Sequence, residues 1–232
     1  MYEQIIAKTR LLQGDENGNR LLLFKNNELI SLSSETRKMG SGDGAIVNFK
    51  NARNCTILIS PKARFYGCKF EFSNSEESII IIDESIHKIF DLNVYIKYSK
   101  GSKCIIGRNF SCVSCMLNLS ETSDIIIGND CMFSANVKIW NWDRHTILNE
   151  EGNCINHAKS ILIGDHVWIG MDASLAKGSK INENSIVGQK SLITKSFDES
   201  NVVIAGIPAK IIKRNVNWDR TPSSIWKANV TE

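Results

Sequence analysis

Residues 163–198 read IGDHVW IGMDAS LAKGSK INENSI VGQKSL ITKSFD, which are consecutive hexads without a gap. The first position of every hexad is aliphatic, and the fifth position is mostly small. An amphipathic helix repeats its apolar face every three to four residues and a half-buried strand every two, so neither explains a period of six. A coil with three flat faces, one hexad to a face, points all the first positions into one narrow interior. The repeat therefore predicts a β-helix whose regular turn contains three hexads.

The same register recurs upstream in IGNDCM FSANVK IWNWDR at residues 127–144, and residues 145–162 interrupt it. Farther upstream, the Ile-Gly pair at 106–107 and the aliphatic clusters at 57–59 and 79–82 follow at comparable steps. These clusters indicate imperfect turns with insertions at their corners. We expect the β-helix to span residues 46–207, with an extended loop at about 145–162.

Both ends of the chain lack hexads. Residues 1–45 are expected to form strands or a cap, and LLLFKNNELISL at 21–32, centred on Asn26 and Asn27, is typical of a hairpin. The spacing from Pro208 to Arg214 is compatible with a helix, so residues 208–232 are expected to form a short C-terminal helix and a tail. In that tail, Trp218 and Trp226 are expected to pack back on a turn.

The composition narrows the class of protein. The 232 residues include 28 Lys and Arg against 25 Asp and Glu, and a net charge of +3 is too small for general binding of nucleic acid or of an anionic membrane. No apolar run approaches the roughly 20 residues that cross a bilayer, and the first residues do not resemble a signal peptide. Seven Cys without paired spacing indicate a reducing cytoplasm. The 32 Ile and 23 Asn favour short strands joined by Asn corners.

The hexads, followed by AGIPAKIIK at 205–213, resemble the left-handed β-helix, hexapeptide-repeat acyltransferases, and the resemblance covers about residues 104–214. Within that family, WNWDRHTI at 140–147, a loop, and then GDHVWIG at 164–170 are similar to O-acetyltransferases that modify sugars of bacterial capsule or lipopolysaccharide. The resemblance implies a mainly β fold and a homotrimer with active sites between neighbouring subunits. It also implies acetyl-CoA as donor, a sugar or polysaccharide as acceptor, and a catalytic His.

Acetyl transfer to a hydroxyl group requires a base, and His suits that role near neutral pH. His145 stands where the hexads stop, at a first position that is otherwise apolar, so the chain is expected to turn outward there. Asp143, two residues earlier, is expected to orient the imidazole. A solvated corner is the alternative interpretation of Asp-x-His, and the family resemblance favours His145 as the base. His166 is the second candidate base and is assigned to the substrate site, whereas His157 and His87 have less supporting context.

Three Trp are candidates for the acetyl and sugar sites. The resemblance implies that Trp168 lines the acetyl site, where its indole shields the thioester; packing at a subunit seam is the alternative. Trp140 and Trp142 flank the His145 turn, where their rings would stack on sugars or form a small core for the inserted loop.

Coenzyme A requires backbone or small side chains along its pantetheine arm and cations for its phosphates. Carried over by position, the resemblance places a set of residues along this path. They are Trp168 and Met171 near the thiol, Gly188 and Gln189 along the arm, Thr194 and Lys195 toward the nucleotide, and Lys210 and Lys213 near the phosphates.

Other chemistries find less support. The Cys fall at positions where a small apolar side chain packs well, and no pair of CxxC motifs has zinc spacing, so neither a covalent cysteine mechanism nor a metal is expected. One alternative function is N-acetylation of a nucleotide-linked amino sugar, although residues 1–60 show no GxGxxG. Another is a β-helix protein that is not an acyltransferase, either a metal-dependent hydrase or a scaffold.

Overall fold

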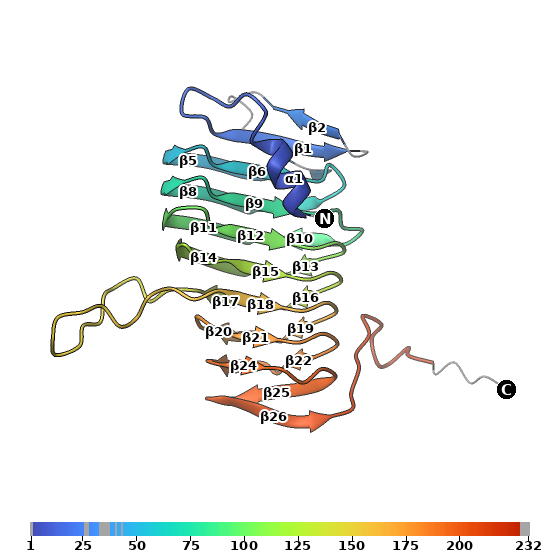
Figure 1. The fold of residues 1–232 in the computed structure, drawn as a ribbon. Helices are drawn as coiled ribbons and strands as arrows, with labels where there is room; N and C mark the ends of the chain where they lie inside the picture. The colour runs from blue at the N-terminus through green and yellow to red at the C-terminus, as the bar shows by residue number, and fades with distance from the viewer. Residues whose placement is uncertain (1, 26–27, 33–37, 40, 43, 228–232) are drawn as a thin grey trace.

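The computed structural model describes residues 2–25, 28–32, 38–39, 41–42 and 44–227, which form a left-handed parallel β-helix (Figure 1). The mainly β, hexapeptide-repeat class predicted from the sequence is thus confirmed. Each turn of the chain contributes one strand to each of three sheets, which we call the first, second and third sheet in the order the chain visits them. The three edges between sheets are the corners of the β-helix.

Among the described residues the three sheets contain nine, nine and eight strands. The first sheet consists of β2 (Glu28–Ser31), β1 (Arg20–Lys25), β6 (Thr56–Ile59), β9 (Ile79–Ile82), β12 (Lys103–Ile106), β15 (Ile125–Ile127), β18 (Ile161–Ile163), β21 (Lys180–Ile181) and β24 (Ser196–Phe197). The second consists of β4 (Ser41–Gly42), β7 (Arg64–Tyr66), β10 (Lys88–Phe90), β13 (Ser111–Cys112), β16 (Met132–Phe133), β19 (Trp168–Ile169), β22 (Ile186–Val187), β25 (Val202–Gly206) and β26 (Ala209–Arg214). The third consists of β3 (Lys38–Met39), β5 (Ala45–Arg53), β8 (Cys68–Glu76), β11 (Leu92–Ser99), β14 (Cys115–Glu121), β17 (Val137–Trp140), β20 (Ser174–Leu175) and β23 (Leu192–Ile193).

The hexad positions fill the interior as predicted. All six first positions between Ile163 and Ile193 are buried, and the six fifth positions are buried beside them. The register joins Ile59, Ile82, Ile106, Ile127, Ile163 and Ile181 across successive turns of the first sheet. The upstream turns are longer because β5, β8 and β11 in the third sheet extend over eight or nine residues.

The stack of strands begins before residue 46, where the sequence placed its start. β1 pairs in parallel with β6, so it already belongs to the first sheet. β1 and β2 pair antiparallel, as a hairpin requires, while Asn26 and Asn27 at its expected tip lie outside the described residues. The helix α1 (Tyr2–Thr9), which the sequence did not predict, packs Ile6 against Leu22, Leu58 and neighbouring residues on the outer face of the first sheet.

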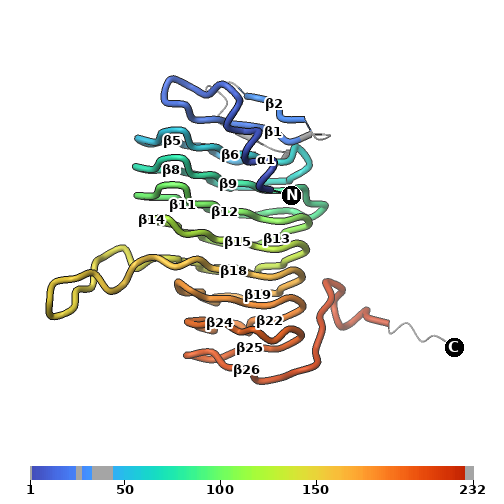
Figure 2. Tube along the Cα trace, viewed as in Figure 1, coloured from blue at the N-terminus to red at the C-terminus, as the bar shows by residue number. Residues whose placement is uncertain are grey.

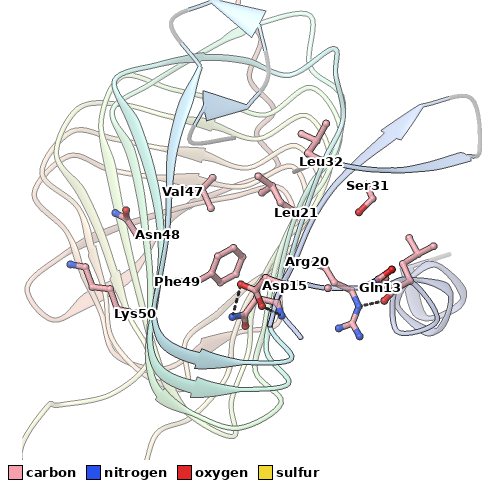
Figure 3. Close-up of a pocket in the computed structure, with 13 residues that line it drawn as sticks. Gln13, Asp15, Arg20, Leu21, Ser31, Leu32, Val47, Asn48, Phe49 and Lys50 are labelled. Carbon is pink, nitrogen blue, oxygen red and sulfur yellow. Dashed lines mark hydrogen bonds between the residues drawn. The ribbon is translucent and has the colours of Figure 1, made fainter. Parts of the chain in front are cut away.

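A pocket of about 770 Å³ lies at this N-terminal end of the coil. Leu21, Val47 and Phe49 point into it, and Arg20 beside it donates from Nε to the Leu12 carbonyl oxygen at 2.6 Å (Figure 3). Its apolar lining continues the core of the β-helix.

The expected C-terminal helix is wrong for residues 209–214, which form the strand β26 antiparallel to β25. Gly206, at a φ of 109°, begins the turn that returns the chain along the open edge of the second sheet. The backbone groups of that edge need partners, and a returning strand supplies them where a helix would not. Beyond β26 the tail turns back toward earlier turns, and Trp218 is buried as predicted, but Trp226 is 55% exposed and does not pack as expected.

A long loop, residues 141–160, leaves the coil between β17 and β18 and projects from one edge of the molecule (Figure 2). A bridge between Leu148 and Cys154 closes its outer part. None of the described helices has the length and apolarity that a membrane span requires.

Candidate active site

The loop with His145 begins at Asn141, which stands where a regular hexad would continue. Asn141 is fully buried, and its side chain accepts a hydrogen bond from the Ser120 backbone N–H at 3.0 Å and donates to the Ser123 hydroxyl at 2.9 Å. These hydrogen bonds hold the corner between the third and first sheets together at the point where the chain leaves the coil. His145 follows in the exposed part of the loop, as predicted from the break in the repeat. Within the described residues its imidazole has no hydrogen bond, so both ring nitrogens are open to a ligand.

Asp143 does not orient that imidazole in this structure. Its carboxylate accepts hydrogen bonds from Lys177 Nζ and, at 2.9 Å, from Asn156 Nδ2. Lys177 holds the pKa of the Asp143 carboxyl below its ordinary value. Asn156 also donates to the His145 carbonyl oxygen at 2.8 Å, and Lys177 donates to the Asn156 carbonyl oxygen at 2.6 Å. Asp143 thus ties the outgoing and returning limbs of the loop to the coil and fixes the backbone of His145.

Trp168 lies on the side of the coil opposite this loop. It begins β19 in the second sheet, whereas the loop leaves the corner between the third and first sheets, which faces away from the second. Figure 1 shows the loop and β19 at opposite edges of the coil. The Trp168 indole N–H donates to the Ser134 hydroxyl at 3.4 Å, which holds the ring along the sheet. One chain therefore does not bring His145 and Trp168 together.

His166 is engaged by Trp218 of the C-terminal tail and by Asp130 of the coil. Its ring stacks on Trp218 with centroids 4.2 Å apart, Nδ1 lies 2.8 Å from Asp130 Oδ2, and Nε2 lies 3.0 Å from the Trp218 carbonyl oxygen. No ring nitrogen remains to contact a substrate, contrary to the expectation for His166. Trp218 also packs against Trp168, with ring centroids 6.2 Å apart.

The other two His are not placed for the reaction. His157 Nδ1 lies 3.3 Å from Glu121 Oε2, at the point where the loop returns to the coil. His87 is half-buried at the start of β10, and its pKa is lowered by burial and by the positive charge of Arg220. Lys88, next to it, lies three strands from Trp168 in the second sheet. Among the four His, His145 is thus the one with an exposed imidazole and no hydrogen bond to the part of the chain that the structure describes.

Trp140 and Trp142 form the root of the loop. The Arg144 guanidinium lies 5.8 Å from the Trp140 ring centroid, and Trp142 makes an edge contact with Tyr98 at 6.4 Å. The buried indole N–H of each Trp has no acceptor within the described residues. Both rings are half-buried at the base of the loop, and the sugar-stacking role considered from the sequence stays a prediction.

The residues expected to hold coenzyme A fall into two groups. Of the predicted residues, Gly188 and Lys210 share one column with Gly170 and Ala205, which were not predicted, along the corner between the second and third sheets. A Cβ on Gly170 would lie 2.6 Å from the Gln189 backbone nitrogen, and a Cβ on Gly188 would lie 2.9 Å from the Ala205 Cβ. At these two glycines the column therefore exposes backbone atoms and not side chains. The exposed side chains of Met171 and Gln189 flank it, and Lys210 stands at its end. Trp168 lies two residues before Gly170 on the same turn, in the adjacent column of the second sheet.

The second group does not share this corner. Thr194 and Lys195 lie between β23 and β24, on the next corner of the coil, where Lys195 Nζ sits 5.4 Å from the Phe197 ring centroid. Lys213 pairs with Val203 near the opposite end of β26. Within one chain the donor path expected from the sequence is thus divided. Lys210 ends the corner column of Gly170 and Gly188, whereas Lys213 ends the column that runs from Trp168 through Ile186 and Val203.

The cysteines and acidic groups form no second reactive centre. All seven Cys are free, and burial raises the pKa of the Cys112 and Cys115 thiols well above the ordinary range. In the described part of the chain no three His, Cys, Asp or Glu side chains gather as metal ligands.

Sequence reasoning missed the residues that brace the site. Arg220 donates to the Asp130 carboxylate at 3.1 Å and to the Ser111 hydroxyl at 2.7 Å, which clamps the tail beside Trp168. Lys177 holds the loop through Asp143. Lys177 occupies the third position of a hexad, which points outward, so its position indicated exposure but not its partner.

Three comparisons with known proteins bear on this geometry. The family model for the bacterial transferase hexapeptide (six repeats) matches residues 160–195. The polysialic acid O-acetyltransferase of Neisseria meningitidis is 34% identical over 186 residues, covering 73% of this chain and 81% of that protein. The galactoside O-acetyltransferase of Escherichia coli K12 is 30% identical over 169 residues, covering 68% of this chain and 81% of that protein. The chain spans 44% of the length of the polysialic acid O-acetyltransferase of Escherichia coli O1:K1, at 36% identity.

Solved structures agree with these relatives. The polysialic-acid-specific acetyltransferase NeuO superposes with a TM-score of 0.60 at 26% identity, covering 90% of this chain and 88% of that one. The polysialic acid O-acetyltransferase OatWY gives a TM-score of 0.59 at 27% identity, covering 88% of this chain and 89% of that one.

Proposed function

The chain belongs to the hexapeptide-repeat acyltransferases, and we propose that it transfers an acetyl group from acetyl-CoA to a hydroxyl group of a bacterial surface polysaccharide or its sugar precursor. The relatives that it covers over most of their length are named O-acetyltransferases of a polysaccharide and of a galactoside. The observation that carries the proposal is the exposed, unengaged imidazole of His145 at the root of a braced loop.

In the proposed reaction His145 is the general base. It accepts the proton of the acceptor hydroxyl, and the oxygen attacks the carbonyl carbon of the thioester. As the C–O bond forms, the C–S bond breaks, and the imidazolium returns the proton to the departing thiolate. Asp143, Asn156 and Lys177 act as positioning residues, because they fix the backbone on either side of the base. The buried, protonated cysteines support direct transfer without a cysteine intermediate.

The donor is proposed to lie along the column that ends at Lys210. Trp168 would shield the thioester from water, the backbone at Gly170 and Gly188 would pair with the amides of the pantetheine arm, and Lys210 would meet a phosphate. From β19 to β26 the column crosses three strand spacings, or about 14 Å. Thr194, Lys195 and Lys213 remain proposed contacts, and the first two would reach the donor from a neighbouring subunit.

A second copy of the chain is needed to complete this site. His145 and Trp168 lie on opposite sides of one coil, so the loop of one subunit must approach the second sheet of another. We therefore propose the homotrimer, which closes the arrangement with three equivalent sites.

Free cysteines and the proposed CoA donor support a cytoplasmic location.

The test is incubation of the purified chain with acetyl-CoA and a panel of polysaccharides and sugar nucleotides, followed by NMR and mass detection of the acetyl group. We expect an O-acetyl ester. Acetyl on the nitrogen of an amino sugar would support N-acetylation instead, and no transfer to any acceptor would refute the proposal. His145→Ala should abolish transfer while the oligomer, measured by light scattering, stays intact.

A further inference from the structure

A groove of about 430 Å³ runs along the corner between the third and first sheets, on the N-terminal side of the loop. It crosses the ends of β5, β8, β11 and β14, and the loop leaves the coil at the next turn. Its lining is polar except for one aromatic ring, Tyr98. The reaction described above does not use this groove.

Tyr98 is in a conformation that its residue type disfavours. Four successive turns place a residue with positive φ at this corner, namely Asn51 at 50°, Asn74 at 50°, Tyr98 at 51° and Glu121 at 56°. Asn tolerates the left-handed region, whereas a bulky side chain there is strained. Burial does not compensate for the strain, because Tyr98 is 64% exposed. An exposed ring held at a strained corner points to a ligand.

The groove ends at both limbs of the loop formed by residues 141–160. Tyr98 contacts Trp142 on the outgoing limb, with ring centroids 6.4 Å apart. Glu121 accepts a hydrogen bond from the Ala158 backbone N–H at 3.1 Å and lies 3.3 Å from His157 Nδ1 on the returning limb. Since Trp142 precedes His145 by three residues, the two Cα atoms are within about 11 Å. A chain molecule lying in the groove is thus directed toward the proposed base.

The charges in the groove leave one cation free. Lys100 is paired with Glu76 at 3.4 Å, and the Asn51 amide donates to the Asn74 side-chain oxygen at 2.6 Å. The exposed Arg53 guanidinium has no side-chain partner among the described residues. A guanidinium binds a carboxylate through two parallel hydrogen bonds, and an exposed Tyr ring stacks on the apolar face of a sugar.

We propose that this corner groove binds a carboxylate-bearing stretch of the acceptor glycan, several sugar units away from the hydroxyl group that is acetylated. The inference rests on the proposed function and adds a determinant of acceptor length and charge. A glycan fits better than a protein partner, because the core of a protein interface is rich in apolar side chains and this lining is not. Acceptors long enough to reach Tyr98 and Arg53 therefore bind more tightly than short ones.

The experiment uses the acceptor on which the unmodified chain turns over, beginning with polysialic acid, cut into oligomers of graded length. The main variant is Tyr98→Asn, since Asn is the residue that the two preceding turns place at this corner. We expect about a ten-fold rise in KM for the longest oligomers, with KM unchanged for the shortest oligomer and for acetyl-CoA. The melting temperature should stay the same or rise, because the substitution relieves strain.

Matched variants separate binding from structure. Tyr98→Phe keeps the ring and should retain the low KM. Tyr95→Asn removes another tyrosine of β11 that lies outside the groove and should leave KM unchanged for oligomers of every length. Arg53→Gln should raise KM for carboxylate-bearing oligomers and should reduce the dependence of KM on salt.

Several results would overturn the proposal. Among them are an equal rise in KM for short and long oligomers in Tyr98→Asn, turnover on neutral glycans only, and a changed oligomeric state, which would assign Tyr98 to a subunit contact. Absence of acetyl transfer by the unmodified chain would refute the proposed function itself. Transfer that is independent of acceptor length would refute the groove alone.

Discussion

Arg220→Ala should release the C-terminal tail from the coil without unfolding the β-helix. Arg220 donates to the Asp130 carboxylate at 3.1 and 3.2 Å, to the Ser111 hydroxyl at 2.7 Å and to three backbone carbonyl oxygens. Hydrogen bonds to charged groups contribute about 1.5–3 kcal/mol. Because the Asp130 side chain is 41% exposed, solvent screening reduces this to about 1–2 kcal/mol.

That loss corresponds to about a 5- to 30-fold increase in the undocked population, at 1.4 kcal/mol for each factor of ten. The indole N–H of Trp218 reports on docking because it donates to the His166 carbonyl oxygen at 2.8 Å. Its hydrogen exchange, followed by NMR, should accelerate by the same factor, whereas the melting temperature of the coil should hardly change. Trp168 would also lose its neighbour, so turnover should fall.

The matched control is Arg214→Ala, which removes an exposed pair with Glu199 at the start of the same tail. Exposed ion pairs contribute little to stability, so hydrogen exchange at the Trp218 indole should stay at the wild-type rate. Unchanged exchange in Arg220→Ala, or equal acceleration in both variants, would refute the view that Arg220 holds the tail.

Three further predictions follow from the site. Trp168→Ala should lower kcat more than ten-fold, whereas Trp226→Ala, which removes an exposed ring, should not; equal kinetics would reduce Trp168 to a packing role. Lys210→Glu should raise KM for acetyl-CoA and leave that for the acceptor unchanged, and an unaltered donor KM would count against the proposed column. Burial raises the pKa of the Cys115 thiol, so the folded state retains its proton, and the contribution of this thiol to thermal stability should be constant below about pH 8.5 and fall above it. Cys115→Ala should weaken that fall, and an identical pH profile would show that other groups cause it.

The hexads made most of the fold predictable. First positions such as Ile163 and Ile181 recur at a spacing that only a three-faced coil places in one interior, and the register joins them as expected. The break at His145 indicated a loop for the same reason, since an imidazole does not fit that interior, but the chain leaves the coil four residues earlier, at Asn141. The repeat carried no information about the partners of outward side chains, so the pairing of Asp143 with Lys177 was not visible.

The ends of the chain were predicted less well. The spacing from Pro208 to Arg214 is compatible with a helix, but the open edge of the second sheet captured the segment as β26. Likewise the sequence assigned His166 to the substrate, whereas Asp130 of the coil engages Nδ1 of its ring and the tail returns over 52 residues to engage Nε2 through Trp218. Local spacing does not encode which distant segment covers a surface.

By itself the sequence determined the three-faced coil, the presence of a loop near residue 145 and the candidate base His145, because an interior that repeats with every turn constrains each residue through its near neighbours. Only the tertiary structure decided that His145 and Trp168 lie on opposite sides of one coil, that the tail packs against Trp168, and that a strained Tyr98 lines a groove leading to the loop. Those relations depend on which corner each residue occupies and on contacts between distant segments, and a one-dimensional repeat specifies neither.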